Sequence, residues 1–281
     1  MKVFNTIQDL RAYLSDFRNN SKIGLVPTMG ALHQGHISLV NESKKQADIT
    51  VTTIFVNPTQ FNNPEDLEKY PRTLKGDLEK LQAANCDVVF APETKEVYPN
   101  KPEVSINLGA ITKELEGKFR PGHFDGVGLV VSKLFHIVQP DLAFFGQKDL
   151  QQFFVIKKLV DELNFPLQLQ MVPTERELNG LAMSSRNMRL SETEKEEAGL
   201  LYKSLKEAQK GLLSSPSTLT VKATIEELFK KSERLSLEYF EVVNTSDFKP
   251  LQVVTEKEKT ALCIAAEIGG VRLIDNLLLI S

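Results

Sequence analysis

The sequence is poor in cysteine and contains no long apolar run, and both absences narrow the class of protein. Its two cysteines, Cys86 and Cys263, cannot form a disulfide framework, and we expect both thiols to stay reduced in a cytoplasmic protein. No apolar run approaches the roughly 20 residues of a membrane-spanning helix. The first residues lack an apolar segment followed by a small-residue cleavage site, so the sequence predicts no secretory signal.

An excess of positive charge is also missing. The 34 lysines and arginines are outnumbered by 37 aspartates and glutamates, which gives a formal net charge of −3. Proteins that bind the nucleic-acid backbone usually show a basic face, so this balance argues against a nucleic-acid partner. With 281 residues, 41% of them hydrophobic and 25% charged, the chain can build one large or two smaller globular domains.

Short apolar runs without polar alternation punctuate the first two-thirds of the chain, as in strands buried on both faces of a parallel sheet. These runs cover residues 23–26, 49–56, 87–90 and 142–145, and the first of them ends before Pro27. Helical patterns alternate with them: a first helix with Ile7, Leu10, Leu14 and Phe17 behind the N-cap Thr6, then 37–46, 73–84, 127–138 and 150–163. The alternation predicts an α/β fold with a doubly wound parallel sheet, whose ligands bind beyond the carboxyl ends of the strands.

The pattern changes near Thr174, where we place a domain boundary. A capping box, Ser191-Glu192-Thr193-Glu194, opens a helix expected to run to about Leu213, and a second helix ends near Ser232. Three strand patterns over 237–243, 260–268 and 270–279 predict a small antiparallel sheet. We therefore expect residues 1–174 to form an α/β domain and residues 175–281 a smaller C-terminal α+β domain.

The segment PTMGALHQGH at 27–36 follows the first predicted strand and holds two of the chain's four histidines, His33 and His36. The helix that begins here offers unpaired N–H groups to an anion, and Gly30 and Gly35 let a phosphate approach the backbone. Two imidazoles can donate hydrogen bonds to a phosphate whose charge grows as pyrophosphate leaves. The alternatives are a capped helix with two polar residues, or part of a metal site, although no third ligand lies at the usual spacing.

Three further segments carry polar side chains suited to a nucleotide or a small acid. In FGQKDLQQ at 145–152, Lys148 suits phosphate and Asp149 can accept from a ribose hydroxyl. In MSSRN at 183–187, two hydroxyls and Arg186 can wrap a triphosphate, and the loop can close over it. In FVNPTQF at 55–61, Gln60 can present its amide to a small apolar pocket. Taken singly, each segment is also compatible with an ordinary turn. Neither the P-loop motif nor the dinucleotide glycine motif occurs anywhere.

These segments, with YPRT at 70–73 and RPGHFDGV at 120–127, resemble the pantothenate synthetase family, the pantoate–β-alanine ligases, in order and spacing. The resemblance covers nearly the whole N-terminal domain and the start of the second. It implies a Rossmann-like sheet of the nucleotidyl-transferase superfamily with the His-x-Gly-His signature, and a homodimer. It also implies an ATP-dependent ligase that condenses (R)-pantoate with β-alanine to pantothenate through a pantoyl-adenylate, releasing AMP and pyrophosphate.

The resemblance assigns roles residue by residue. The family's ATP site falls on Met29, Gly30, Ala31, Leu32, His33, Gln34, Gly35, His36, Gly146, Gln147, Lys148, Asp149, Glu175, Met183, Ser184, Ser185 and Arg186. The implied catalytic residues are His36 as proton donor, His33, Lys148, Ser184, Ser185 and Arg186. Gln60 and Gln152 fall where the family holds pantoate.

Two positions depart from the family's pattern. Many members carry glutamate where this chain has Gln147, and some carry adjacent acids near magnesium where it reads Gly76-Asp77. We therefore expect Mg²⁺ to travel with ATP and assign it no protein ligand, since a cation that bridges phosphates usually keeps several waters.

Three rival interpretations stay open on the sequence. Another adenylyl- or cytidylyl-transferase would share the His-x-Gly-His loop but not the pair Gln60 and Gln152. An RNA-binding or tRNA-charging protein is disfavoured by the acidic balance and by a C-terminal domain without a basic cluster. An inactive structural relative is disfavoured because all the candidate polar residues are present.

Overall fold

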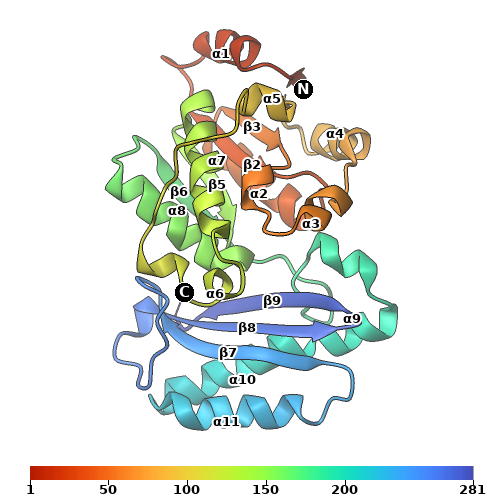
Figure 1. Cartoon of the computed structure of the whole chain (residues 1–281), viewed down its shortest axis with the longest axis vertical. Helices are drawn as coiled ribbons and strands as arrows, with labels where there is room; N and C mark the ends of the chain where they lie inside the picture. The colour runs from red at the N-terminus through yellow and green to blue at the C-terminus, as the bar shows by residue number, and fades with distance from the viewer. Residues whose placement is uncertain (281) are drawn as a thin grey trace. The chain divides into compact units, whose positions relative to one another are not determined.

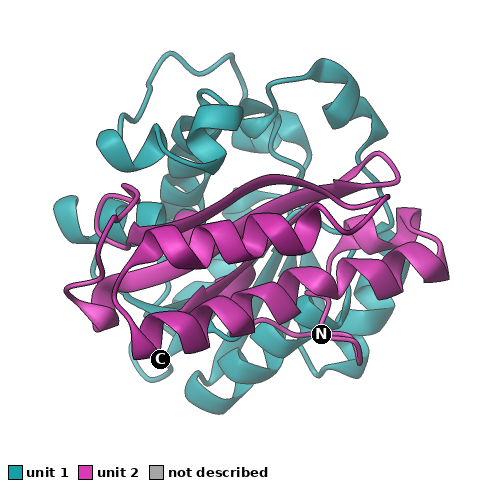
Figure 2. Ribbon diagram, turned by 90° about the horizontal axis from the view of Figure 1, so that it is seen from below, with its two compact units in different colours: residues 1–146, 152–173 teal, residues 147–151, 174–281 magenta. Residues whose placement is uncertain are grey.

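The computed structural model describes residues 1–280 and divides the chain into two compact units, coloured separately in Figure 2. Unit 1 contains residues 1–146 and 152–173. Unit 2 contains residues 147–151 and those from Thr174 onward. The short segment Gln147–Gln151 therefore groups with unit 2, whereas the sequence pattern placed it in the N-terminal domain. Among the described residues, no helix combines the length and the apolar character that a membrane span requires.

Unit 1 is built on a six-stranded parallel sheet of order β1-β4-β3-β2-β5-β6. Figure 1 labels β3, β2, β5 and β6 of this sheet. The strands are β1 (Lys2–Phe4), β2 (Ile23–Thr28), β3 (Ile49–Ile54), β4 (Val88–Phe90), β5 (Leu142–Gly146) and β6 (Gln168–Val172). The predicted α/β doubly wound, Rossmann-like sheet is confirmed. The sequence pattern missed β1 and β6, because both are edge strands whose side chains are mostly exposed or half-buried and so lack a continuous apolar run.

Pro27 lies inside β2, where the sequence pattern had ended the strand. Residue 27 keeps its place opposite Thr53 of β3. Pairing with β5 on the other side ends at Leu25 and Ala143. A proline removes one ladder hydrogen bond, and beyond Leu25 that loss falls where β2 is paired on one side only.

Helices connect the strands of unit 1 and cover its sheet. They are α1 (Ile7–Ser15), α2 (Gln34–Gln46), α3 (Pro64–Lys69), α4 (Leu74–Ala83), α5 (Thr94–Val97), α6 (Glu116–Phe119), α7 (His123–Val138) and most of α8 (Leu150–Glu162), with short 3₁₀ turns η1 (Pro58–Gln60) and η2 (Ala110–Thr112). Thr6 caps α1 as predicted, by accepting a hydrogen bond from the N–H of Asp9. The α2 helix packs against α4 and against β2, β3 and β5, where buried Val26, Val40 and Phe144 form part of the core.

Unit 2 is a three-stranded antiparallel sheet backed by helices, as the sequence predicted. Its strands β7 (Ser236–Asn244), β8 (Thr260–Ile268) and β9 (Val271–Leu278) pair in chain order. The helices α10 (Leu200–Ser214) and α11 (Thr218–Phe229) pack along this sheet (Figure 1), and α9 (Glu192–Ala198) precedes them. Three 3₁₀ turns, η3 (Gln147–Asp149), η4 (Ser185–Arg189) and η5 (Lys257–Lys259), complete the unit.

The prediction of a single long helix from Ser191 to about Leu213 is wrong. The helix is interrupted at Gly199, so that α9 ends at Ala198 and α10 begins at Leu200. The capping box itself is present, with Ser191 and Glu194 exchanging side-chain and backbone hydrogen bonds. A β-carbon at position 199 would lie 2.9 Å from the carbonyl oxygen of Asn179. The side chain of Asn179 also donates to the carbonyl of Lys195 at 2.7 Å. The loop that contains Asn179 therefore packs against the helix at this point and divides it into α9 and α10.

Candidate active-site residues

The chain leaves β2 at Thr28 and turns through two left-handed residues before α2 begins. Gly30 has φ = 83° and Ala31 has φ = 50°. Glycine adopts this conformation without strain, whereas alanine does so only where its surroundings hold it. His33 is the N-cap of α2, and His36 lies in the first turn of the helix. The predicted strand–turn–helix setting of the PTMGALHQGH segment is therefore present.

The two histidines cap the helix with their own side chains. The backbone N–H of Gly35 donates to Nδ1 of His33 at 3.1 Å, and the N–H of His33 donates to Nδ1 of His36 at 3.3 Å. The two ring centroids lie 4.1 Å apart. Because each Nδ1 accepts a hydrogen bond, each neutral ring carries its proton at Nε2. Both imidazoles therefore have their N–H donors on the nitrogen that the cap does not use.

Side chains of helix α4 hold the backbone of this turn. The carboxylate of Asp77, which is fully buried, accepts from the N–H of Ala31 at 2.9 Å and from the N–H of Leu32 at 2.7 Å. Lys80, three residues further on the same helix, donates to the carbonyl of Leu32 at 2.6 Å. Asp77 also accepts from the hydroxyl of Thr73. Both oxygens of this carboxylate are thus engaged in holding the backbone.

The position that reads Gly76-Asp77 does not fit a magnesium ligand set. Gly76 has no side chain, and the Asp77 carboxylate is occupied as described above. Among the described residues, no group of three or more histidine, cysteine, aspartate or glutamate side chains could hold a metal ion. We assign no protein ligand to Mg²⁺.

Gln60 is buried at the end of η1, where its side chain is fixed at both ends. Its Oε1 accepts from the amide of Asn57 at 3.1 Å, and its Nε2 lies 3.0 Å from the sulfur of Met29. Asn57 is held in turn by the hydroxyl of Tyr98, which donates to its Oδ1 at 2.9 Å. Burial raises the pKa of the Tyr98 phenol, so this hydroxyl stays protonated and available as a donor. The FVNPTQF segment therefore places the polar side chain of Gln60 in a fixed position beside the turn after β2.

The RPGHFDGV segment holds η1 from the side of α7. Nε2 of His123 lies 3.1 Å from the guanidinium of Arg120, and its Nδ1 lies 2.9 Å from the carbonyl oxygen of Gln60. Arginine only donates, so Nε2 accepts and Nδ1 carries the proton that binds Gln60. A β-carbon at Gly126 would lie 2.2 Å from the carbonyl oxygen of Thr59, so only glycine allows α7 to approach this closely.

In unit 2 the structure brings together three of the predicted phosphate-binding side chains. Lys148, Ser184 and Arg186 line one small pocket. Arg272, which the sequence analysis did not single out, lines the same pocket and forms an ion pair with Glu238. Basic side chains and a hydroxyl in one pocket suit a phosphate group.

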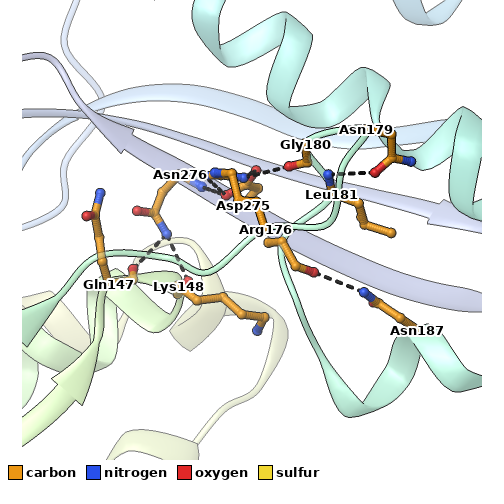
Figure 3. Close-up of polar contacts among 10 residues, drawn as sticks. Gln147, Lys148, Arg176, Asn179, Gly180, Leu181, Asn187, Asp275 and Asn276 are labelled. Carbon is orange, nitrogen blue, oxygen red and sulfur yellow. Dashed lines mark hydrogen bonds and ion pairs between the residues drawn. The ribbon is translucent and has the colours of Figure 1, made fainter. Parts of the chain in front are cut away.

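The segment that carries Lys148 is attached to β9 through Asn276 (Figure 3). The side-chain amide of Asn276 donates to the carbonyl of Gln147 at 3.0 Å and to the carbonyl of Lys148 at 2.8 Å. The preceding residue, Asp275, accepts two hydrogen bonds from Arg176 at 2.6 and 3.0 Å. Burial raises the pKa of Asp275, while the charges of Arg176 and Lys148 act in the opposite direction.

The other predicted residues are distributed over the two units. Met29, Gly30, Ala31, Leu32, Gln34, Gly35, Gly146 and Gln152 lie in unit 1, and Gln147, Asp149, Glu175, Met183 and Ser185 lie in unit 2. Ser184 caps η4 by accepting from the N–H of Arg186. Met183 donates its N–H to the carbonyl of Glu175 at 2.9 Å, which closes the loop between them. The carboxylate of Asp149 lies 3.4 Å from Nζ of Lys148.

The structure therefore groups the predicted residues in two sets. In unit 1, His33 contacts His36 and Gln60 contacts Met29, and in unit 2 Lys148, Ser184 and Arg186 line one pocket. That both sets act on one ATP molecule stays a prediction.

Sequence reasoning missed the residues that hold these sets in place. They are Asp77 and Lys80 for the turn, His123 for Gln60, and Asp275 and Asn276 for the Lys148 segment. Two of them had a signal: His123 lies in the RPGHFDGV motif without an assigned role, and Asp77 lies where some relatives carry acids near magnesium. The others sit in ordinary helix and strand patterns.

Known proteins of one family match this chain over nearly its full length. The family model described as pantoate–β-alanine ligase matches residues 2–278. The pantothenate synthetase of Cytophaga hutchinsonii is 46% identical over 277 residues, which covers 98% of each chain. That of Carboxydothermus hydrogenoformans is 47% identical over 284 residues, which covers 99% of each.

Two solved structures are similar at the level of the fold as well. The pantothenate synthetase of Thermus thermophilus matches with a TM-score of 0.92 and 37% identity over 99% of both chains. The pantoate–β-alanine ligase of Francisella tularensis, solved with β,γ-ATP and β-alanine, matches with a TM-score of 0.80 and 35% identity. This second match covers 100% of the present chain and 98% of the other.

Proposed function

The chain belongs to the pantoate–β-alanine ligase family, and we propose that it condenses (R)-pantoate with β-alanine to pantothenate at the expense of ATP. The observation that carries the proposal is the turn before α2, where the Nδ1 atoms of His33 and His36 both accept backbone N–H groups and each neutral ring carries its proton at Nε2. The relative from Francisella tularensis, solved with β,γ-ATP and β-alanine, supports the same reaction class.

The reaction needs two steps, because a carboxylate is a poor electrophile in water. In the first step an oxygen of the pantoate carboxylate attacks the α-phosphorus of ATP, a P–O bond forms, and the bond to pyrophosphate breaks. In the second step the amine of β-alanine attacks the acyl carbon of the pantoyl-adenylate, AMP leaves, and the amine releases its proton. Holding the reactants in line supplies several kcal/mol of the barrier reduction.

The two histidines stabilise the charge that develops on the phosphates. With Nδ1 of each ring accepting a backbone N–H, the Nε2–H of each can donate to a phosphate oxygen. His36 is the proton donor to the departing pyrophosphate, and His33 binds phosphate beside it. The N-terminus of α2 adds its partial positive charge, and the backbone of Met29–Leu32 and Gln34–Gly35 lines the nucleotide.

The residues of unit 2 have the chemistry to bind phosphate as well. Lys148, Ser184, Ser185 and Arg186 stabilise the transferring phosphate, supported by the pocket that Lys148, Ser184 and Arg186 share. Asp149 accepts from the ribose, and Gly146, Gln147, Glu175 and Met183 complete the nucleotide contacts.

Pantoate is bound by Gln60 and Gln152. Gln60 is buried and fixed by Asn57 and Met29, so its amide is already oriented when the hydroxy acid arrives. A neutral amide orients the substrate without becoming a competing nucleophile.

Three further properties complete the proposal. Mg²⁺ enters bound to ATP and neutralises part of the phosphate charge, with no protein ligand assigned. The enzyme works as a homodimer, as is typical of the family. It works in the cytoplasm, in keeping with two buried cysteines that form no disulfide.

Pantoate-dependent exchange of radiolabelled pyrophosphate into ATP tests this function. We expect exchange with ATP and pantoate in the absence of β-alanine, and AMP release only after β-alanine is added. Exchange that proceeds without pantoate, or only with another nucleotide acceptor, would favour a different nucleotidyl-transferase. Tight binding of tRNA in a filter assay at low salt would instead support a tRNA-charging protein.

A further inference from the structure

We propose that Asn276 on β9 is a positioning residue that holds the backbone of the Lys148 segment, so that Lys148 meets the phosphates in a fixed place. The inference rests on the role proposed above for Lys148. Asn276 itself has no contact with substrate or the reacting atoms, and it acts through Lys148 alone.

The hydrogen bonds of Asn276 point to this role. Its amide donates to two consecutive carbonyls, those of Gln147 and Lys148, at 3.0 and 2.8 Å. A flipped amide would place its oxygen against two carbonyl oxygens, so these partners determine the orientation. The residue is only 3% exposed, so water does not compete for these hydrogen bonds.

The oxygen of the same amide forms no hydrogen bond within the described part of the chain that would offset the free energy of burying it. Oδ1 of Asn276 is buried and has no hydrogen-bond partner among the described residues. Burying an amide with an unpaired oxygen costs free energy, which an apolar side chain of similar size would avoid. The gain that offsets this cost lies in the two bonds to the Lys148 segment.

The residue before Asn276 holds the second phosphate-binding segment. Asp275 binds Arg176 through two hydrogen bonds, and Arg176 also donates to the carbonyl of Gly180 and lies over the ring of Tyr202. The loop from Glu175 to Met183 leads directly into Ser184 and Arg186. Two adjacent residues of one strand therefore fix both Lys148 and the loop that lines its pocket (Figure 3).

The decisive experiment removes the two donors of Asn276 and asks whether Lys148 is the route of the effect. In Asn276→Asp a carboxylate replaces the amide at the same size and cannot donate to either carbonyl. We expect the kcat of pantoate-dependent pyrophosphate exchange to fall at least about tenfold, since small displacements of catalytic groups cost this much or more. The KM for pantoate should change less than about twofold, because its proposed ligands lie in unit 1.

A double-variant comparison separates positioning from general damage. In the Lys148→Ala background, Asn276→Asp should lower kcat by less than about twofold, because the side chain it positions is gone. Asn276→Ala, which adds no charge, should repeat the kcat loss and decides the matter if the aspartate variant does not fold.

Gln209 offers a matched control in the same unit. Its side-chain amide donates to the consecutive carbonyls of Leu278 and Leu279, both at 3.1 Å, so Gln209→Glu removes an equivalent pair of hydrogen bonds. We expect this variant to lower the melting temperature while it keeps the wild-type kcat for exchange.

The possible outcomes distinguish the inference from the proposed function. A wild-type kcat in both Asn276 variants, with Lys148→Ala impaired, overturns the inference alone. A loss that is equally large in the Lys148→Ala background also overturns it, because the effect then bypasses Lys148. If Lys148→Ala itself exchanges at the wild-type rate, the proposed role of Lys148 is wrong and the inference fails with it.

Discussion

Three histidines of unit 1 differ in the ring nitrogen that carries the proton, and their neighbours decide which. In His33 and His36 the Nδ1 atoms accept backbone N–H groups, so Nε2 is the donor. In His123 the guanidinium of Arg120 donates to Nε2, so Nδ1 is the donor and binds the carbonyl of Gln60. The first arrangement places the N–H donor on Nε2, on the side of the ring away from the cap, whereas the second uses Nδ1–H to hold the protein backbone.

Substitutions at His36 can separate these two functions of one ring. His36→Asn keeps an oxygen near the δ position for the N–H of His33 but has no donor at the ε position. His36→Gln places an amide N–H near the ε position. We expect His36→Asn to lower the rate of pantoyl-adenylate formation by on the order of 10²-fold and His36→Gln to lower it less.

Single-turnover quench-flow experiments with ATP and pantoate measure this rate directly. Thermal unfolding of both variants serves as the control for the lost cap. An unchanged rate in His36→Asn would rule out the proton-donor role, and a larger loss in His36→Gln than in His36→Asn would assign the effect to the cap instead.

At the scale of elements, α4 acts as a brace for the loop that follows β2. Asp77 and Lys80 lie on one face of the helix and together bind three backbone groups of Ala31 and Leu32. This loop includes a non-glycine residue with positive φ, a conformation that persists only where the surroundings enforce it. The brace therefore determines the backbone geometry that an anion would meet.

Asp77→Asn tests the brace, because the amide group turns one oxygen acceptor into a donor that faces a backbone N–H. We expect the free energy of unfolding to fall by about 1–3 kcal/mol. We also expect the KM for ATP to rise severalfold, since the loop loses its fixed shape. Chemical denaturation and steady-state kinetics measure the two effects.

Asp141→Asn is the matched control for this variant. Asp141 accepts from the backbone N–H of Ile23 at 2.7 Å, at the opposite end of β2 from the loop. The control should lose stability without a change in the KM for ATP. If the two variants behave alike in the kinetics, α4 supports the fold and has no effect on ATP binding.

The sequence predicted the central strands of the sheet better than its edge strands. It also predicted where the loops lie better than which side chains hold them. Strands such as β3 and β5 are buried on both faces and show as apolar runs, while β1 and β6 do not. The loops with His33 and Lys148 follow strands, so their position was readable from spacing. The partners of these loops were not, because Asp77 and Asn276 are 45 and 128 residues away from Leu32 and Lys148.

At the scale of the whole molecule, each compact unit contains one buried thiol. Cys86 lies in unit 1 and Cys263 in unit 2, and both are nearly inaccessible to solvent. Burial raises the pKa of Cys86, which lowers the fraction of reactive thiolate. The pair therefore gives a natural reporter for the opening of each unit.

We expect a thiol reagent to label neither cysteine in the folded protein during the time in which it labels both in guanidinium chloride. Absorbance of the released chromophore measures the labelling. The single variants Cys86→Ala and Cys263→Ala assign each phase to its unit. Rapid labelling of Cys86 in native buffer would contradict the packing of β4 and α2 around it.

The assignment of Gln147–Gln151 to unit 2 also affects how the enzyme can be dissected. These residues lie between β5 and the remainder of α8 in the chain, yet the amide that binds their carbonyls comes from residue 276. A fragment truncated after Pro173 would carry Lys148 without this amide, and the complementary fragment would carry the amide without Lys148. Neither half can be expressed with a complete phosphate-binding set, so complementation in trans would have to rebuild it from two polypeptides.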